Sequence, residues 1–444
     1  MTSVQSPTQH TFPLSPTTAQ AMASLAAAVD APAAEETLYI SEPDQAFWAG
    51  RTSETLSALM RNAGSYTDDQ AASHLRLLND LVVPSFGPQP GPNAPTLPLL
   101  TSNNSPFEPS WNITDRGSSA IRFSFEPMGR SGGSPSDPFA QEIVSAILPA
   151  VASRAHGIDL TWFEHLQKSL FLTKAEEATA RARLPAGVRA PTSFLAFDLD
   201  GDRAVFKAYF FPILKHVATG ASCEDVAFSA IRSLPQAAPM LPAADRLEAY
   251  LAKGASIPVP LEMIAIDCVD PAAGARVKIY GRTESNAFDV VREVATLAGQ
   301  VVDAVTLEGL DILQGVWGLL HNRPGVGPSE NTPPRIWDTR HKGICYGFEL
   351  KPGCEWPETK VYVPVWQYAD SDAVIAKNLV AVFRSRGWAV AEKYEDAVPE
   401  CFPRSDTKTT TGSHSYVSFA FSAKKGVYMT MYYSISPQDA VVAL

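Results

Sequence analysis

The sequence predicts an α+β fold in which a ten-stranded antiparallel β-barrel is surrounded by helices. The first observation behind this prediction is a strand pattern that recurs along the chain. Marked strand positions occur at Glu126, Lys207, Lys278, Lys360 and Tyr428, with spacings of 81, 71, 82 and 68 residues. Repeats that each bury only part of a hydrophobic face must stack together. Five units, each with two antiparallel strands and helical segments, would supply ten strands, and a sheet of that size can close around a lumen.

The second observation is that three of these strands place a cation and a tyrosine on the same side. The segments are Lys207-Ala-Tyr209, Arg276-Val-Lys278-Ile-Tyr280 and Lys360-Val-Tyr362. Side chains alternate across a strand with period two, so the apolar residues between them point the other way. Closure of the sheet would turn the polar face into the lumen. An open α+β sheet with solvated lysines on one face is the alternative.

The remaining elements follow from periodicity and turn signals. Residues 1–35 are rich in Ser, Thr, Pro and Ala and are expected to form a disordered tail, followed by one barrel domain over 36–444. The segment 84–110 is rich in Pro, Gly and Asn and is expected to be a loop. Asp200-Gly201 predicts a hairpin turn. We expect helical structure over 43–83, 139–155, 160–182, 243–253, 286–298, 302–320 and 371–387. We expect strands over 121–126, 194–199, 204–210, 416–422 and 427–433.

Composition excludes several classes of function. The net charge of -11 disfavours nucleic acid and anionic membranes as partners. Five cysteines without metal spacing indicate reduced thiols in a cytoplasmic protein. The sequence contains no run of 18 apolar residues, so no membrane span is expected. No aspartate-rich motif and no phosphate-binding glycine loop is present, so neither a metal nor a cofactor is expected. A monomer and a homodimer both remain open.

The inward positions indicate a site for an anionic substrate with an aromatic partner. The four cations Lys207, Arg276, Lys278 and Lys360 could together hold a diphosphate. Five tyrosines would supply π faces that stabilise an allylic cation: Tyr209, Tyr280, Tyr362, Tyr428 and Tyr432. Glu126 could accept a hydrogen bond from an N–H or O–H of an aromatic acceptor. The alternatives are a solvated cationic face, tyrosines that pack in the core, and a structural ion pair of Glu126 with Arg122 or with a neighbouring strand.

The chain resembles the fungal aromatic (indole) prenyltransferases of the dimethylallyltryptophan synthase type. The segments that carry the resemblance are Phe125-Glu126-Pro127, Asp137-Pro138-Phe139, Lys207-Ala-Tyr209-Phe-Phe-Pro212, Arg276-Val-Lys278-Ile-Tyr280, Lys360-Val-Tyr362-Val-Pro364 and Gly426-Val-Tyr428-Met-Thr-Met-Tyr432, with support from Pro106-Phe-Glu108-Pro-Ser-Trp111-Asn112 and Val316-Trp317-Gly-Leu-Leu320. The resemblance implies the family's barrel and transfer of a dimethylallyl group from dimethylallyl diphosphate to an aromatic ring without an obligatory metal. It also implies that Glu126 binds the indole N–H and that the cations and tyrosines above hold and shield the diphosphate.

Three departures from the family pattern concern the acceptor and the diphosphate. Phe194 stands where tryptophan C4-prenylating members carry a lysine base, and no Lys or Arg occurs between Lys253 and Arg276 to hold an amino-acid carboxylate. Pro138 replaces a basic phosphate ligand of some members, for which Arg130 could compensate. We therefore expect an uncharged indole acceptor, such as a cyclic dipeptide or an indole alkaloid. A phenolic acceptor and a non-catalytic carrier of an anionic amphiphile are the alternatives.

Overall fold

The computed structural model of the chain describes residues 38–91, 97–185, 187–338 and 340–437, so the expected tail over 1–35 lies outside the described residues. Ten strands form a closed barrel in the order β1-β10-β9-β8-β7-β6-β5-β4-β3-β2, and every neighbouring pair is antiparallel. The strands are β1 (Phe107–Thr114), β2 (Ser119–Phe125), β3 (Ser193–Asp200), β4 (Arg203–Phe210), β5 (Leu261–Asp267), β6 (Val277–Thr283), β7 (Ile344–Leu350), β8 (Glu358–Val363), β9 (His414–Ser422) and β10 (Gly426–Tyr433). The predicted fold class is confirmed.

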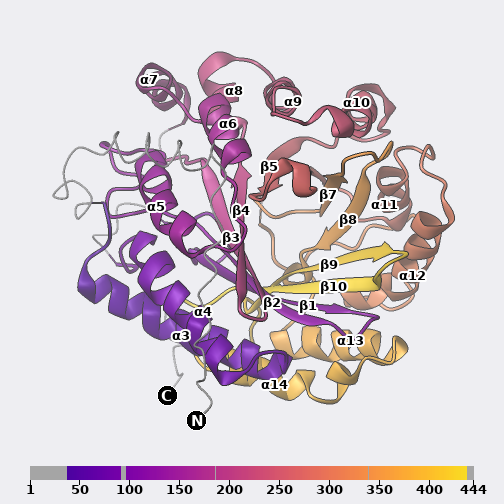
Figure 1. The fold of residues 1–444 in the computed structure, drawn as a ribbon. Coiled ribbons are helices and arrows are strands. Elements are labelled where there is room, and N and C mark those ends of the chain that lie inside the picture. The colour runs from indigo at the N-terminus through magenta and orange to yellow at the C-terminus, as the bar shows by residue number, and fades with distance from the viewer. Residues whose placement is uncertain (1–37, 92–96, 186, 339, 438–444) are drawn as a thin grey trace, which may run out of the picture.

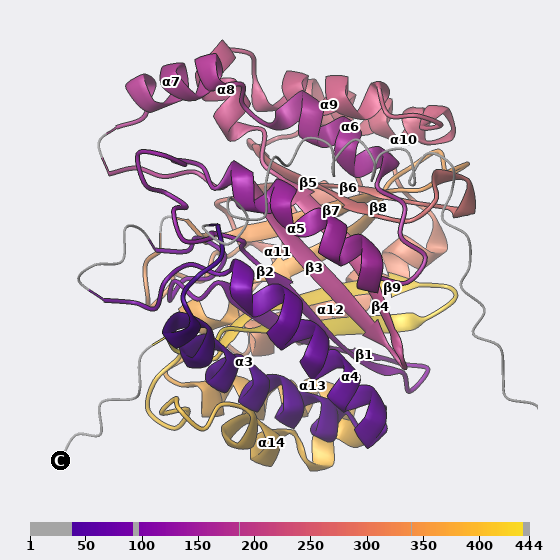
Figure 2. The same ribbon diagram turned by 60° about the vertical axis from the view of Figure 1, so that its left-hand side comes forward.

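Helices surround this barrel (Figures 1 and 2). They are α3 (Glu42–Ala63), α4 (Asp68–Leu77), α5 (Gln141–Arg154), α6 (Thr161–Leu170), α7 (Lys174–Arg183), α8 (Ile213–Thr219), α9 (Cys223–Arg232), α10 (Leu241–Ala249), α11 (Phe288–Ala295), α12 (Ala304–Leu320), α13 (Asp372–Ser385) and α14 (Tyr394–Cys401). Short 3₁₀ or π turns are η1 (Leu78–Val82), η2 (Val83–Ser85), η3 (Ala238–Met240), η4 (Tyr250–Gly254), η5 (Pro271–Ala273), η6 (Val365–Gln367) and η7 (Ala389–Glu392). None of the described helices is both long enough and apolar enough to cross a membrane.

The outer face of the barrel forms the hydrophobic core with the helices. Val277, Ile279 and Val363 are fully buried in it, as the alternation of β6 and β8 predicts. On the first strands this layer is aromatic: the rings of Phe123 and Phe197 lie 5.7 Å apart. Burying these side chains on the outside leaves the intervening polar side chains no direction but the lumen.

The barrel closes where the first and last strands meet, and Asp115 holds this seam. Its carboxylate accepts a hydrogen bond from the Val427 N–H at 2.8 Å and pairs with Arg386 Nη2 at 2.7 Å. A side chain at Gly426 would place its Cβ 2.5 Å from Asp115 Oδ2, so this position, at φ +65°, requires glycine. N-terminal α3 also packs against C-terminal α14 in both views, which closes the ring of helices (Figures 1 and 2).

The structure differs from the sequence prediction at several elements. Strand β1 begins inside the segment expected to be a loop, because Pro109 hides the strand signal. Its pairing with β10 starts only at Ser110, so the missing proline N–H costs that ladder no hydrogen bond. The helix expected over 160–182 is two helices, since Thr173 begins α7 with a capping box. The predicted hairpin at Asp200-Gly201 is confirmed, and Asp200 pairs with Arg203 across it.

Candidate active site

The barrel lumen contains two cavities that share one wall. The larger has a volume of about 540 Å³ and is also lined by residues of α12 and of the loop between β7 and β8. We call it the cationic cavity. The smaller, of about 120 Å³, is called the acceptor cavity below. Side chains that line both cavities are Ser124, Tyr209, Tyr280, Tyr362 and Tyr432.

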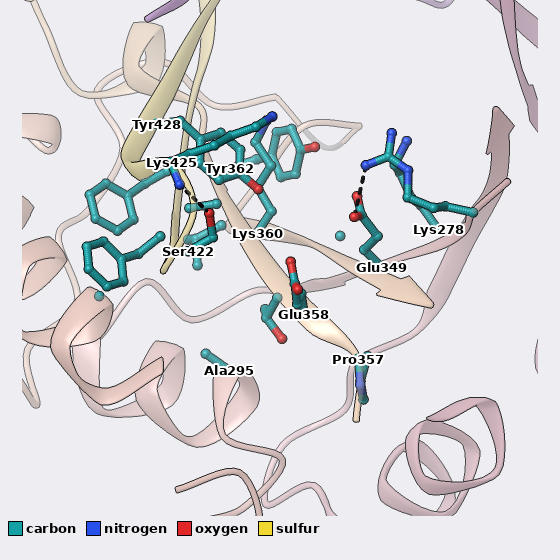
Figure 3. A pocket seen from close by; sticks show the side chains of 18 of the residues that line it. Lys278, Ala295, Glu349, Pro357, Glu358, Lys360, Tyr362, Ser422, Lys425 and Tyr428 are labelled. Atoms are coloured by element: carbon teal, nitrogen blue, oxygen red, sulfur yellow. Dashed lines mark hydrogen bonds and ion pairs between the residues drawn. The ribbon is translucent and has the colours of Figure 1, made fainter. Parts of the chain in front are cut away.

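Cationic side chains converge on the cationic cavity from four strands, from the residue that precedes β6 and from the turn between β9 and β10. They are Arg122, Lys207, Arg276, Lys278, Lys360 and Lys425. The four cations that the alternation pattern singled out are therefore brought together, and the structure adds Arg122 and Lys425. Figure 3 shows Lys278, Lys360 and Lys425 around the cavity, with Tyr362 and Tyr428 beside the last two.

Two aspartates, the buried Asp267 and the half-buried Asp198, organise part of this cluster. Asp267 on β5 pairs with Lys278 Nζ at 2.9 Å and with Arg276 Nε at 2.6 Å. Burial alone would raise the pKa of Asp267, but Lys278, Lys207 and Arg276 hold it far below its usual value. Asp198 on β3 pairs with Lys207 and Arg122, and the two cations lower its pKa to about 2 against the opposing effect of burial. Both aspartates are thus ionised and keep the cations extended toward the lumen.

Lys360 differs from these paired cations. No carboxylate of the described residues lies within 4.0 Å of its Nζ, which donates a hydrogen bond to Thr430 Oγ1 at 3.3 Å. Its Nζ lies 5.3 Å from the ring centre of Tyr362 and 5.4 Å from that of Tyr428. Burial and the charge of the neighbouring cations, Arg122 foremost among them, hold the pKa of Lys360 well below its usual value. A diphosphate in the cavity would supply the anion that this ammonium lacks.

The tyrosines of the shared wall form a continuous belt of rings. Ring centres are 6.1 Å apart between Tyr209 and Tyr280, 5.8 Å between Tyr280 and Tyr362, and 5.8 Å between Tyr362 and Tyr432. The belt crosses β4, β6, β8 and β10, one tyrosine from each strand. Tyr428 lies in the cationic cavity only. An allylic carbon at the boundary of the two cavities would thus face π surfaces that stabilise a cation.

The acceptor cavity contains a carboxyl group that the sequence pattern did not single out. Glu108 on β1 lines this cavity together with Phe194, Met263 and Cys345. Its Oε1 accepts a hydrogen bond from Ser415 at 2.9 Å. Burial raises the pKa of Glu108 to about 8, although the bond from Ser415 opposes the shift. This carboxyl group can accept a hydrogen bond from an N–H inside a largely apolar space.

Glu126 does not occupy the lumen position expected for it. Strand β2 ends at Phe125, and Glu126 Oε2 accepts a hydrogen bond from the Leu100 N–H at 2.9 Å. The other oxygen of the same carboxylate pairs with Arg189. Glu126 is buried and is not among the residues that line either cavity. The chain leaves the sheet one residue before Glu126, so its alternation with Ser124 no longer sets its direction.

Weak sequence signals existed for the functional residues that were missed. Arg122 and Ser124 alternate on the same strand, and both line the cationic cavity. Glu108 and Ser110 also alternate, but Pro109 between them disguises the strand. Lys425 lies in a hairpin turn, where no periodicity indicates a direction. Among the described residues, no group of three or more His, Cys, Asp or Glu side chains is placed to hold a metal ion.

Comparisons with known proteins agree with this geometry. Residues 44–397 match the tryptophan dimethylallyltransferase family. The indole diterpene prenyltransferase terF of Tolypocladium album is 35% identical over 412 residues, which cover 88% of this chain and 94% of terF. The 7-dimethylallyltryptophan synthase hasE of Aspergillus fumigatus is 35% identical over 408 residues, covering 88% and 84%. The crystal structure of NotF with brevianamide F and DMSPP has a TM-score of 0.77 at 24% identity and covers 94% and 99%. The chain belongs to the tryptophan dimethylallyltransferase family.

Proposed function

We propose that this protein transfers a dimethylallyl group from dimethylallyl diphosphate to the indole ring of a small acceptor. The observation that carries the proposal is the belt of four tyrosines between a cavity lined by six cations and a cavity lined by a carboxyl group. A donor with a diphosphate in the first cavity would place its allylic carbon at the belt. An indole in the second cavity would meet that carbon from the other side.

The reaction is an electrophilic aromatic substitution. The C–O bond of the donor breaks, and its electron pair leaves with the diphosphate, whose charge is stabilised by Lys360 and the neighbouring cations. The allylic cation is held against the tyrosine rings. An indole carbon then forms the new C–C bond, and loss of the proton from that carbon restores the aromatic ring. The cationic side chains thus stabilise the leaving diphosphate, and the tyrosine rings stabilise the allylic cation.

We propose that Glu108, rather than Glu126, is the carboxylate of the protein that binds the indole N–H of the acceptor. Glu108 lines the acceptor cavity, whereas the two oxygens of Glu126 are already bound to Leu100 and Arg189. A hydrogen bond from an indole N–H to the Glu108 carboxylate would orient the ring and increase its electron density. The Glu126 assignment that the family resemblance implied stays a prediction, and the matched substitutions described in the Discussion separate the two residues.

The proposed acceptor is an uncharged indole compound, such as a cyclic dipeptide or an indole alkaloid. Phe194 and Met263 line the acceptor cavity, and neither can pair with an amino-acid carboxylate. The relative terF is named as an indole diterpene prenyltransferase, and NotF is solved with brevianamide F. Free tryptophan is the second candidate, because hasE is named as a 7-dimethylallyltryptophan synthase. A carrier function is not supported, since these relatives are named as transferases or a synthase.

Three further properties belong to the same proposal. Residues 36–444 act as one catalytic domain, which the continuous barrel from β1 to β10 supports. Neither a metal nor a cofactor is required, because cationic side chains take the part of a metal in the diphosphate site. The protein works in the cytoplasm as a monomer or a homodimer, and its five cysteines are all free thiols, as a reducing compartment requires.

The test is incubation of the protein with dimethylallyl diphosphate and a panel of indoles. We expect pyrophosphate release together with an acceptor product heavier by one dimethylallyl group. Release of pyrophosphate that no indole accelerates, with no prenylated product, would refute the proposed transfer.

A further inference from the structure

A β-bulge in β5 brings an acidic side chain next to an arginine that lines the acceptor cavity. Leu261 pairs with Gly281 and Met263 pairs with Tyr280, so Glu262 is the extra residue between two successive pairs. A bulge of this kind redirects a side chain that regular alternation would send to the other face. Met263 keeps its place in the cavity, and Glu262 turns toward Arg282 on the neighbouring strand β6.

The two side chains meet in a bidentate pair. Arg282 Nε donates to Glu262 Oε1 at 2.7 Å, and Arg282 Nη2 donates to Glu262 Oε2 at 3.1 Å. The remaining nitrogen, Nη1, donates to the Tyr416 hydroxyl at 3.3 Å and to the Lys342 carbonyl at 3.2 Å. Such a fork-to-fork geometry is the strongest that a guanidinium makes with a carboxylate. All three guanidinium nitrogens of Arg282 are therefore engaged before any substrate enters.

The position of the pair determines the charge that an acceptor meets in the cavity. Arg282 and Tyr416 line the acceptor cavity, whereas Glu262 does not. The Arg282 side chain is 11% exposed and the Glu262 side chain 32%. Among the described residues that line this cavity, Arg282 is the one arginine, and no lysine lines it. Besides tyrosines and Cys345, the other titratable side chains are those of Glu108 and His341. His341 pairs with Asp338 at 3.1 Å. Glu262 thus cancels the cationic charge that Arg282 would present to a substrate.

We propose that Glu262 is a specificity-determining residue that makes the acceptor cavity select uncharged indoles over indoles that carry a carboxylate. The proposal rests on the proposed function, because it takes this cavity as the place of the indole. A carboxylate that reached Arg282 would have to displace Glu262 from a bidentate pair, or remain desolvated without a partner. An amide or an ester meets no such penalty. The pair is a repulsive element against the wrong substrate rather than an added contact to the right one.

The decisive experiment uses two acceptors of the same shape and different charge, indole-3-propionic acid and indole-3-propionamide. Glu262→Gln keeps the size and one acceptor atom of the side chain but removes its charge, which leaves Arg282 with an uncompensated positive charge. We expect the acid-to-amide ratio of kcat/KM to rise at least tenfold over wild type. We expect Arg282→Gln, which leaves Glu262 unpaired, to lower the same ratio. Ratios within twofold of wild type in both variants would overturn the proposal.

Two measurements separate this proposal from folding defects and from the proposed function. Glu284→Gln is the matched control, because the Glu284 carboxylate pairs with Lys342 rather than with Arg282. It should leave the ratio unchanged, and a tenfold rise there would also overturn the role of Glu262. The Kd of each acceptor, measured by titration calorimetry, tests charge selection without turnover. If wild type binds both compounds but prenylates neither these nor any indole of the panel described above, the proposed function fails, while the ratio of Kd values still decides the role of Glu262.

Discussion

Replacement of Glu108 by glutamine is the sharpest test of how the acceptor is bound. The side chain keeps its shape and its place beside Ser415, but it can no longer offer a charged acceptor to an indole N–H. A hydrogen bond to a charged group contributes about 1.5–3 kcal/mol, and each 1.4 kcal/mol is a factor of ten. We therefore expect kcat/KM for an indole acceptor to fall roughly 10- to 150-fold wherever the wild-type carboxyl group is ionised.

The pKa of Glu108 sets the pH range in which this loss is visible. Because burial raises the pKa to about 8, the protonated form dominates near neutrality and the carboxylate forms only as the pH rises through about 8. At pH 7 about a tenth of the wild-type protein carries the charge, so the loss there should shrink by about tenfold. The kcat/KM of wild type should rise between about pH 7 and pH 9, and that of Glu108→Gln should stay flat.

The assay is steady-state prenylation at saturating donor, with kcat/KM for the acceptor measured from about pH 6 to about pH 9.5. Glu126→Gln is the matched comparison, since it makes the same chemical change at a carboxylate that lines neither cavity. Loss of its pair with Arg189 should cost about 1–3 kcal/mol of stability but leave the alkaline rise in place. If Glu126→Gln removes the rise and Glu108→Gln keeps it, the reasoning from cavity geometry is refuted.

Three other outcomes are expected. Lys360→Met should raise the KM for dimethylallyl diphosphate at least tenfold while leaving the melting temperature unchanged or higher, because this half-buried ammonium has no carboxylate partner among the described residues. A lower melting temperature with an unchanged KM would contradict this expectation. Activity should persist in excess EDTA, because the side chains that line the cationic cavity can neutralise the diphosphate without a metal ion. A complete loss of activity that magnesium restores would contradict this expectation. Free L-tryptophan should have a lower kcat/KM than a cyclic dipeptide that contains tryptophan. The reverse order would contradict the conclusion, drawn from Phe194 and the paired Arg282, that the cavity selects an uncharged acceptor.

The sequence by itself determined which residues share a face of the sheet. Period-two alternation places Lys207 with Tyr209, and Lys278 with Tyr280, from the order of the amino acids alone, because a strand leaves its side chains only two directions. The spacing of these strands determined the number of repeats, and hence a sheet large enough to close. The resemblance of ordered segments along the chain identified the family, which the match over residues 44–397 confirms.

Only the tertiary structure decided what each polar residue meets. Alternation sets a direction while the chain stays in the sheet, and it fails where the chain leaves the strand, as at Glu126, or gains a residue, as at Glu262. Ion pairs between neighbouring strands cannot be predicted from alternation either, since Asp267 reaches Arg276 and Lys278 only when β5 and β6 lie side by side. Glu108 became a candidate because closure of β1 against β10 brought it into the lumen, in the same cavity wall as the tyrosine belt. These contacts join segments that are distant in the chain, so no local pattern of residues specifies them.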